Sequence, residues 1–349
     1  MNNICFYKMN DKEITIYDIA EKLGLSSATV SRALNGGKGN KKATVDLVIE
    51  TARKMGYRPN TIASSLRKKE TKTVGLIVPR IDMHFHSMVI SGVQDKAREY
   101  GYNLLISQSN EDVNIEAELV STMFSSRVDG LMLSTTMFTS EIAVIESFNK
   151  QKNPFVFFDR VPQNYMGPVI EGDDYLGGYM ATEHLILNGC KRIAHFSGPM
   201  GSNIYKNRLA GYKDALIKHN LPVDEEIIFE HILTKDSSLS ASEQMFGLKK
   251  VPDALFASND LSAIVAAQTA KAKGLAIPDD FAVVGYSNDP RTEIFVPAIT
   301  SVDQAAYEMG HLVFQTLYQQ MNSEESLILP RKQVVGVHLI ERESSKRHK

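Results

Sequence analysis

Short apolar runs alternate with amphipathic helices from Thr73 onward, and this alternation constrains the fold more than any other feature of the chain. The runs are continuously apolar, which is typical of parallel strands covered on both faces of a sheet. The expected strands are 73–79, 102–108, 128–134, 154–160, 169–173, 192–198, 227–232, 253–260, 281–289, 299–303 and 334–343. The expected helices are 86–100, 113–125, 139–149, 175–189, 204–219, 238–247, 261–273 and 304–321.

The strands and helices fall into two similar series joined by crossovers, which predicts a core over residues 73–343 made of two doubly wound α/β subdomains. A ligand cleft is expected between them, at the carboxyl ends of the strands. The expected boundaries are an N-subdomain of about 73–173 plus 287–303 and a C-subdomain of about 174–286 plus 304–343. The basic residues 344–349 are expected to form a frayed tail.

Residues 14–56 have a different, all-helical pattern, and residues 1–13 before them form a polar N-terminal extension. Thr15 can cap a first helix, with Asp18 placed favourably for the helix dipole. The apolar stripe of this helix consists of Ile16, Ile19, Ala20 and Leu23. Gly24 can adopt the positive φ of a tight interhelical turn, so the segment is expected to be a helix-turn-helix.

The second helix of this motif begins after Ser26, a favourable capping residue. Val30, Ala33 and Leu34 are expected to face inward. The outward positions are slim and suit a DNA major groove: Ser27, Ala28, Ser31 and Arg32. A third helix, about 43–55, is expected to close the core of this head with Val45, Val48, Ile49 and Ala52, and to end at Gly56.

Residues 57–72 connect the head to the core. Pro59 favours an extended entry, and Asn60 can cap a two-turn helix that carries Ile62, Ala63 and Leu66. A helix this short is marginal alone. Two alternatives stay open: the segment is a linker, or it folds only with DNA and a partner copy.

Charge is distributed unevenly. Residues 1–72 hold 14 Lys and Arg against 7 Asp and Glu, whereas the remainder holds 25 against 34. A basic head on an acidic body predicts a polyanionic partner for the head alone. No run of 18 apolar residues and no signal peptide are found, and Cys5 and Cys190 give no disulfide framework. We therefore expect a cytoplasmic chain without membrane partners.

Several ordered motifs resemble the lactose/galactose-repressor (LacI/GalR) family of bacterial transcription regulators. They cover about residues 14–343: ITIYDIAEKLGLSSATVSRALN, YRPNTIASSLRKKETKTVGLIVP, the DR pair at 159–160, GDDYLGGYMATEHL, RLAGYKDAL, FASND and VVGYSND. The resemblance implies a lambda-repressor-like head and a periplasmic-binding-protein-like core. It also implies a homodimer on a pseudo-palindromic operator, controlled by a small effector that we expect to be a sugar or sugar derivative.

The resemblance implies roles in DNA binding. Ser27, Ala28 and Arg32 should face base edges, with Arg32 a candidate for guanine. Leu66 should wedge into the minor groove at the operator centre. The full set of expected DNA contacts is Thr15, Tyr17, Ser26, Ser27, Ala28, Thr29, Ser31, Arg32, Asn35, Tyr57, Asn60, Ala63 and Leu66.

The resemblance also implies effector contacts, at Phe85, Asp159, Arg208, Asn259, Ser287 and Gln304. The chain departs from the family at Ser287, where Asp is common, and at Met83-His84-Phe85-His86, where Asn-Pro-Phe-Phe is common. Both departures leave the identity of the ligand open. Asp159 and Arg208 could instead form structural ion pairs, and Asn259 could merely cap a helix.

No nucleophile–base pair accompanies these motifs, so we do not expect an enzyme. His84 and His86 have no third ligand at a suitable spacing, and neither a metal nor a cofactor is expected. Two rivals stay open: an α/β enzyme with an accessory DNA-binding head, and a solute-binding protein. Turnover of a ligand would support the first, and the absence of sequence-specific DNA binding would support either.

Overall fold

The computed structural model describes residues 14–36, 39–57, 70–139, 153–162, 165–322 and 332–347. The chain divides into two compact units between Thr71 and Lys72, the head and the core, and each is described by itself. Within the described residues, no helix has the length and apolar character needed to cross a bilayer. The expected extension (1–13), the hinge residues Asn60, Ala63 and Leu66, and the expected helix 139–149 lie outside the described residues, save Thr139.

The head contains three helices, α1 (Ile16–Leu23), α2 (Ser27–Leu34) and α3 (Lys42–Lys54). Thr15 and Asp18 form the predicted cap as a reciprocal capping box. Gly24 has a φ of 60°, as the tight turn requires. The Ser26 side chain accepts the Thr29 N–H and caps α2. The predicted helix-turn-helix is therefore present.

The core of the head is a small cluster of buried side chains from all three helices: Ile19, Ala20, Val30, Ala33, Val48 and Ala52. One prediction was wrong here, because Ile49 is 51% exposed instead of buried. Thr51 takes the buried position on the opposite side of the α3 pattern. Helix α3 is therefore rotated slightly about its own axis, relative to the orientation that the apolar spacing alone predicts.

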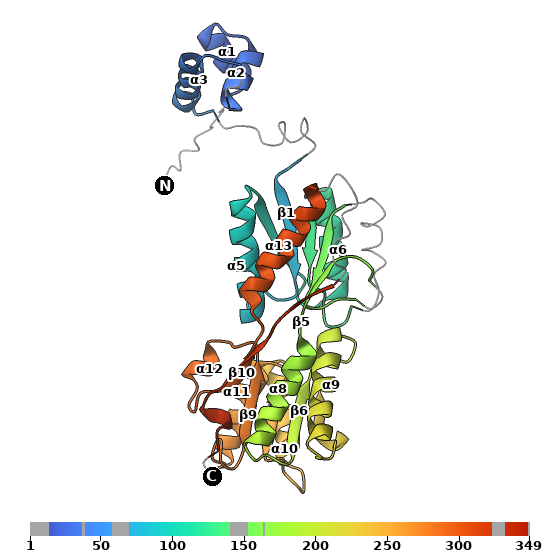
Figure 1. Cartoon of the computed structure of the whole chain (residues 1–349). Helices are drawn as coiled ribbons and strands as arrows, with labels where there is room; N and C mark the ends of the chain where they lie inside the picture. Colours follow the sequence, from blue (N-terminus) through green and yellow to red (C-terminus); the bar gives the residue numbers. More distant parts are fainter. Residues whose placement is uncertain are drawn as a thin grey trace, which may run out of the picture. The chain divides into compact units, whose positions relative to one another are not determined.

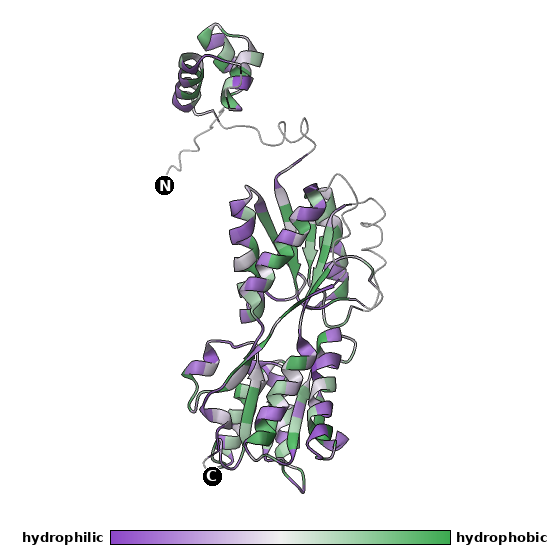
Figure 2. Cartoon of the chain, viewed as in Figure 1, coloured by the Kyte–Doolittle hydropathy of each residue, from purple (hydrophilic) through white to green (hydrophobic). Residues whose placement is uncertain are grey.

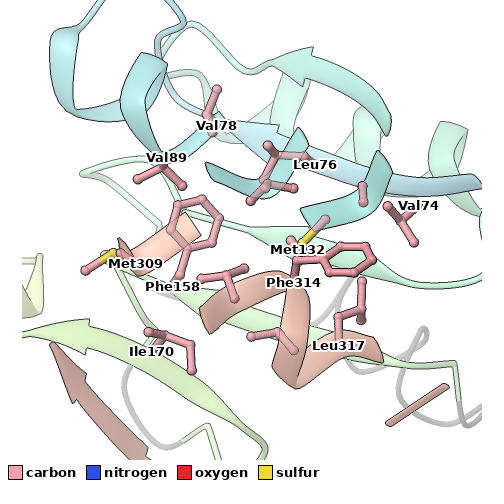
Figure 3. Close-up of a cluster of buried hydrophobic side chains, with 14 of the residues drawn as sticks. Val74, Leu76, Val78, Val89, Met132, Phe158, Ile170, Met309, Phe314 and Leu317 are labelled. Atoms are coloured by element: carbon pink, nitrogen blue, oxygen red, sulfur yellow. The ribbon is translucent and has the colours of Figure 1, made fainter. Parts of the chain in front are cut away.

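The first sheet of the core has six parallel strands in the order β11-β5-β4-β3-β1-β2. The strands are β1 (Thr73–Val78), β2 (Asn103–Gln108), β3 (Leu131–Leu133), β4 (Phe155–Phe158), β5 (Val169–Gly172) and β11 (Lys332–Val335). Helices cover both faces of this sheet (Figure 1): α5 (His84–Glu99), α6 (Val113–Ser125) and α13 (Ala306–Asn322). Figure 3 shows one face, where Phe158, Phe314 and Leu317 pack with aliphatic strand residues.

The second sheet has the order β12-β10-β9-β8-β6-β7, and only β12 is antiparallel. Its strands are β6 (Ile193–Ser197), β7 (Ile228–Glu230), β8 (Ala254–Ala257), β9 (Ala282–Tyr286), β10 (Thr300–Asp303) and β12 (His338–Ile340). Helices α8 (Asp174–Leu187) and α9 (Asn203–Lys218) pack with one face, and α10 (Lys235–Phe246) and α11 (Asp260–Ala272) with the other. Figure 2 shows the apolar strands inside and the polar helix surfaces outside. The predicted doubly wound architecture is confirmed.

The boundaries predicted for the two subdomains need correction. Strand β10 pairs with β9 and β12, so residues 300–303 belong to the second sheet and not to the first. Helix α13 packs against α5 and the first sheet, so residues 306–322 belong there. Glycines at the α5–α13 contact make this packing close, since a Cβ on Gly92 would lie 2.2 Å from the Tyr307 carbonyl oxygen. The chain crosses between the sheets after β5, after β10 and after β11.

The predicted frayed tail was also wrong for residues 344–347. Ser344 and Ser345 are fully buried in a short 3₁₀ turn, η2 (Glu343–Ser345). The Ser344 hydroxyl donates to the Val283 carbonyl and accepts the Thr300 N–H. Arg347 pairs with Asp253. The small hydroxyls satisfy backbone groups of β9 and β10, which explains how a polar sequence becomes part of the core.

Candidate DNA-binding and effector sites

The outer surface of α2 carries the side chains predicted to contact DNA. Ala28 and Arg32 are exposed, and Ser27 is half-buried beside them. Within the described part of the head, no carboxylate pairs with the Arg32 guanidinium. A slim helix surface with one unpaired guanidinium fits the geometry of bidentate guanine recognition.

Other predicted DNA contacts already have local hydrogen bonds. The Ser26 and Thr29 hydroxyls lie 2.8 Å apart, and the Asn35 Nδ2 donates to the Ser31 carbonyl. Thr15 is engaged with Asp18. Tyr17 is 69% exposed, whereas Tyr57 is half-buried. Any hydrogen bond from these groups to a DNA phosphate would have to use a donor that is not already engaged. Their contacts with DNA stay predictions.

In the core, polar side chains follow the strands directly. Ser134 follows β3, Asp159 follows β4, Ser258 follows β8, Ser287 follows β9 and Gln304 follows β10. Three of the predicted effector residues, Asp159, Ser287 and Gln304, are in this set. The carboxyl ends of parallel strands lie at one edge of their sheet. Ser134 and Asp159 therefore lie at that edge of the first sheet, and Ser258, Ser287 and Gln304 lie at that edge of the second.

Arg208 is the centre of the best-defined network. Its Nε donates to the Asp174 carboxylate at 2.8 Å, and its Nη1 donates to the Ser258 carbonyl at 2.7 Å. Its Nη2 donates to Gln304 at 3.1 Å, and Gln304 in turn donates to the Ser287 hydroxyl at 2.9 Å. The structure therefore joins Arg208, Gln304 and Ser287, three of the predicted effector residues, in one connected chain.

Close packing of α8 against α9 positions this ion pair. A Cβ on Gly178 would lie 2.2 Å from the Arg208 carbonyl oxygen, so only glycine permits this approach. Burial raises the pKa of Asp174 to about 6, and the neighbouring Arg208 limits that rise. The Arg208 guanidinium also stacks on Tyr286.

Asp159 lies at the end of β4 with a left-handed φ of 58°. Ser134 donates a hydrogen bond to its carboxylate at 3.2 Å, and the His86 Nε2 lies 3.9 Å from the same oxygen. Burial opposes ionisation, but His86, Arg160 and Arg208 outweigh it and lower the pKa of Asp159. A buried, ionised acceptor in a strained conformation is a candidate binding group.

Arg160 forms a second buried ion pair. Its Nη1 lies 2.7 and 3.0 Å from the two Glu111 carboxylate oxygens, and its Nη2 donates to the Tyr205 hydroxyl at 3.3 Å. Tyr205 is on α9, against the second sheet, whereas Arg160 follows β4 of the first. This hydrogen bond therefore crosses between the subdomains.

Asn203, at the start of α9, makes the most complete bridge between the subdomains. Its Nδ2 donates to the Asp159 carbonyl and to the Glu171 carboxylate, both at 3.1 Å. Its Oδ1 accepts the Val161 N–H at 3.1 Å. Met137 adds an apolar contact, because it is buried in a cluster with residues of the second subdomain: Ile204, Tyr205 and Leu233.

Two predicted effector residues have structural roles in this conformation. Phe85 is buried in the core of the first subdomain. The Asn259 Oδ1 accepts the Ser262 N–H and caps α11, and its Nδ2 donates to the Leu233 carbonyl. The helix-cap alternative for Asn259 is thus present, and effector contact by either residue stays a prediction.

Several residues of this network have no role predicted from the sequence, among them Glu111, Arg160, Asp174, Tyr205 and Tyr286. Asp173 caps α8, and the adjacent Asp174 is buried against Arg208. A usable signal existed for Arg160 and Tyr286, because each lies at the end of an apolar run.

A cavity of about 400 Å³ lies away from this network, lined by Lys191, Arg192 and Asp224 among others.

A helix-turn-helix head joined to a core of two doubly wound subdomains, with buried charges between them, defines a DNA-binding regulator with a ligand-binding core. Residues 15–60 match the lacI family of bacterial regulatory proteins, and residues 182–345 match the periplasmic binding protein-like domain. The chain is 33% identical to catabolite control protein A of Priestia megaterium over 312 residues, 89% of this chain and 93% of that protein.

Two solved structures are similar over almost the whole chain. The complex of the transcriptional regulator CelR with cellobiose has 28% identity and a TM-score of 0.72, and covers 95% of this chain and 100% of that one. The lac repressor dimer bound to operator and the anti-inducer ONPF has 25% identity and a TM-score of 0.86, with 96% and 99% covered. The chain belongs to the lacI family, and it is a DNA-binding transcription regulator.

Proposed function

We propose that this regulator binds a pseudo-palindromic operator as a homodimer and that a small carbohydrate between the core subdomains controls the binding. One observation carries the proposal. The chain combines an exposed α2 surface, on which no described carboxylate of the head pairs with Arg32, with a core in which buried charges, Asp159 and Arg208 among them, converge where the subdomains meet. A single head offers too little surface for tight specific binding, so two heads on two half-sites are expected.

Control by the effector would act through the contacts that cross the subdomains. In this proposal the bridges of Asn203 and Arg160 form in one state of the core and break in another, so a ligand that prefers one state shifts the population. The segment 57–72 connects the core to the head. In this proposal a shifted core changes the pairing of the two hinge segments, and Leu66 enters the minor groove only when they pair.

Selection of DNA sites in vitro, with purified protein and with or without a panel of sugars, tests the proposal. We expect enrichment of one site with two-fold symmetry, and a changed yield of that site with the effector. Enrichment of an asymmetric site, or of none, would contradict the homodimeric operator. Leu66→Ala should then weaken binding to the selected site more than to unrelated DNA, and equal losses at both would exclude the wedge.

A further inference from the structure

Two buried guanidiniums flank one aromatic ring where the subdomains meet. The guanidinium carbons of Arg160 and Arg208 lie 5.9 and 5.8 Å from the centre of the Tyr205 ring. Each guanidinium has a carboxylate of its own, Glu111 for Arg160 and Asp174 for Arg208. Both arginines therefore resemble phosphate-binding residues by type and position, but both are already neutralised.

Carboxylates outnumber guanidiniums around this row. Asp159 is buried beside it, and in the described part of the core its ion-pair neighbour within 4 Å is the His86 imidazole, at 3.9 Å, and not an arginine. Three carboxylates thus face two guanidiniums and one imidazole. An anionic ligand would have to displace Glu111 or Asp174 and would meet the Asp159 carboxylate, an arrangement that disfavours it strongly at low dielectric.

Further polar atoms at the same place lack hydrogen-bond partners among the described residues. The Ser202 and Ser258 hydroxyls, the His86 Nε2 and the Arg160 Nε are buried without a hydrogen bond. Ser202 precedes the bridging Asn203, and the Ser258 carbonyl accepts from Arg208. Such groups exchange hydrogen bonds with hydroxyls of a ligand, and the ionised Asp159 accepts from them.

Glu111 is held where it neutralises Arg160. Its backbone has a left-handed φ of 59°, next to Asn110 at 55°, a conformation that costs non-glycine residues energy. Its Oε2 also accepts the Met137 N–H at 2.9 Å, which fixes the position of the carboxylate. The strained backbone and the second hydrogen bond both favour one position of this carboxylate.

We propose that the effector is an uncharged polyhydroxyl compound and that Glu111 determines this, because it occupies the guanidinium of Arg160 and thereby excludes phosphorylated ligands. The inference rests on the proposed effector role of the core. It narrows the ligand from any sugar or sugar derivative to sugars without a phosphate group. It also identifies one side chain that sets the distinction.

The test uses inorganic phosphate and glucose 6-phosphate as probes of full-length protein, with unphosphorylated glucose beside them. Wild-type protein should show no saturable phosphate binding in calorimetry, at constant ionic strength. Glu111→Gln keeps the shape of the side chain but removes its charge, and should show saturable binding of both phosphate probes, at least about tenfold tighter than any residual binding by the wild-type protein. Glu111→Gln with Arg160→Gln should lose that gain. Glu243→Gln is the control, because it breaks the exposed pair with Lys273 instead.

Saturable phosphate binding by wild-type protein that Arg160→Gln removes would overturn the proposal. A folded Glu111→Gln variant that gains no phosphate binding would overturn it equally. If that variant does not fold, the wild-type titration decides: absence of binding supports the proposal, and binding sensitive to Arg160→Gln overturns it. These results do not depend on DNA, so failure to select an operator would refute the proposed function separately.

Discussion

The guanidinium carbon of Arg208 lies 3.7 Å from the centre of the Tyr286 ring, and Asp174 bonds to both residues. The ring covers one face of the guanidinium while the carboxylate holds its edge. Arg208 is thereby fixed in one orientation, with its Nη2 toward Gln304. Arg208 therefore neutralises a buried carboxylate, and the same contacts hold its guanidinium in one defined position.

Arg208→Ala should abolish the response to effector and destabilise the core. Removal of the guanidinium leaves the Asp174 carboxylate buried without its partner, which costs about 3–5 kcal/mol in comparable cases. Thermal unfolding followed by circular dichroism measures the loss of stability. Release from the selected operator, titrated with effector, measures the response.

Asp174→Asn combined with Arg208→Ala separates the two effects. Without the unpaired charge, the double variant should recover much of the lost stability and still fail to respond to effector. A double variant as unstable as Arg208→Ala would show that the unpaired Asp174 charge does not cause the loss of stability. A retained response would exclude Arg208 from the effector site.

Arg32→Ala should relax the preference for one base pair in each half-site of the operator. A bidentate guanine contact contributes about 1–3 kcal/mol of discrimination against other bases. Sequencing of selected sites measures the preference directly. Arg53→Ala, which removes an exposed charge from α3, is the matched control and should leave the selected sequence unchanged. An unchanged sequence for Arg32→Ala would refute the assignment.

Local chemistry explains what could be predicted from the sequence. Thr15, Gly24 and Ser26 define the helix ends of the head because their effects act within one turn. The subdomain boundaries could not be predicted in the same way. The apolar pattern of β10 and α13 is the same for either sheet, and only tertiary packing decides that β10 joins the second and α13 the first.

The effector site shows the same contrast between residues that the sequence predicts and residues that only tertiary packing brings together. Asp159 and Ser287 could be named because they lie in motifs that resemble the family, and each follows a strand directly. Their partners could not, because they come from distant segments: Glu111 is 49 residues from Arg160, and Gln304 is 96 from Arg208. Asp174 becomes a buried ion-pair partner only through the close approach of α9 at Gly178, which the local sequence does not indicate.

Glu116 should make stability depend on pH. Burial raises the pKa of Glu116 to about 7, against hydrogen bonds from the Thr136 N–H and the Thr139 hydroxyl. Between about pH 4.5 and 7 the unfolded state releases the proton that the folded state retains, so this group lowers stability as pH rises through that window. The loss amounts to about 2–3 kcal/mol at pH 8 relative to pH 4.5.

Glu116→Gln should remove this contribution. Other buried groups titrate as well, so the quantity to measure is the difference in stability between variant and wild type at each pH, from urea unfolding. The variant should become increasingly more stable than wild type as the pH rises from 5 to 8. Glu118→Gln, at an exposed position of the same helix, is the control. A constant difference for Glu116→Gln would show that its carboxylate titrates normally.

Asn203→Ala should loosen the contact between the subdomains at a position that can be observed directly. The Val161 N–H donates to the Asn203 Oδ1, so its hydrogen exchange should accelerate in the variant by about five- to tenfold or more, because a net hydrogen bond contributes about 1 kcal/mol. The Phe157 N–H, which donates to the Pro168 carbonyl within the first sheet, should keep its wild-type rate. Lys206→Ala, at an exposed position of the same helix, is the control and should change neither rate. Equal acceleration at Val161 and Phe157 would indicate general destabilisation of the first subdomain, and an unchanged Val161 would show that Asn203 does not hold the two subdomains together.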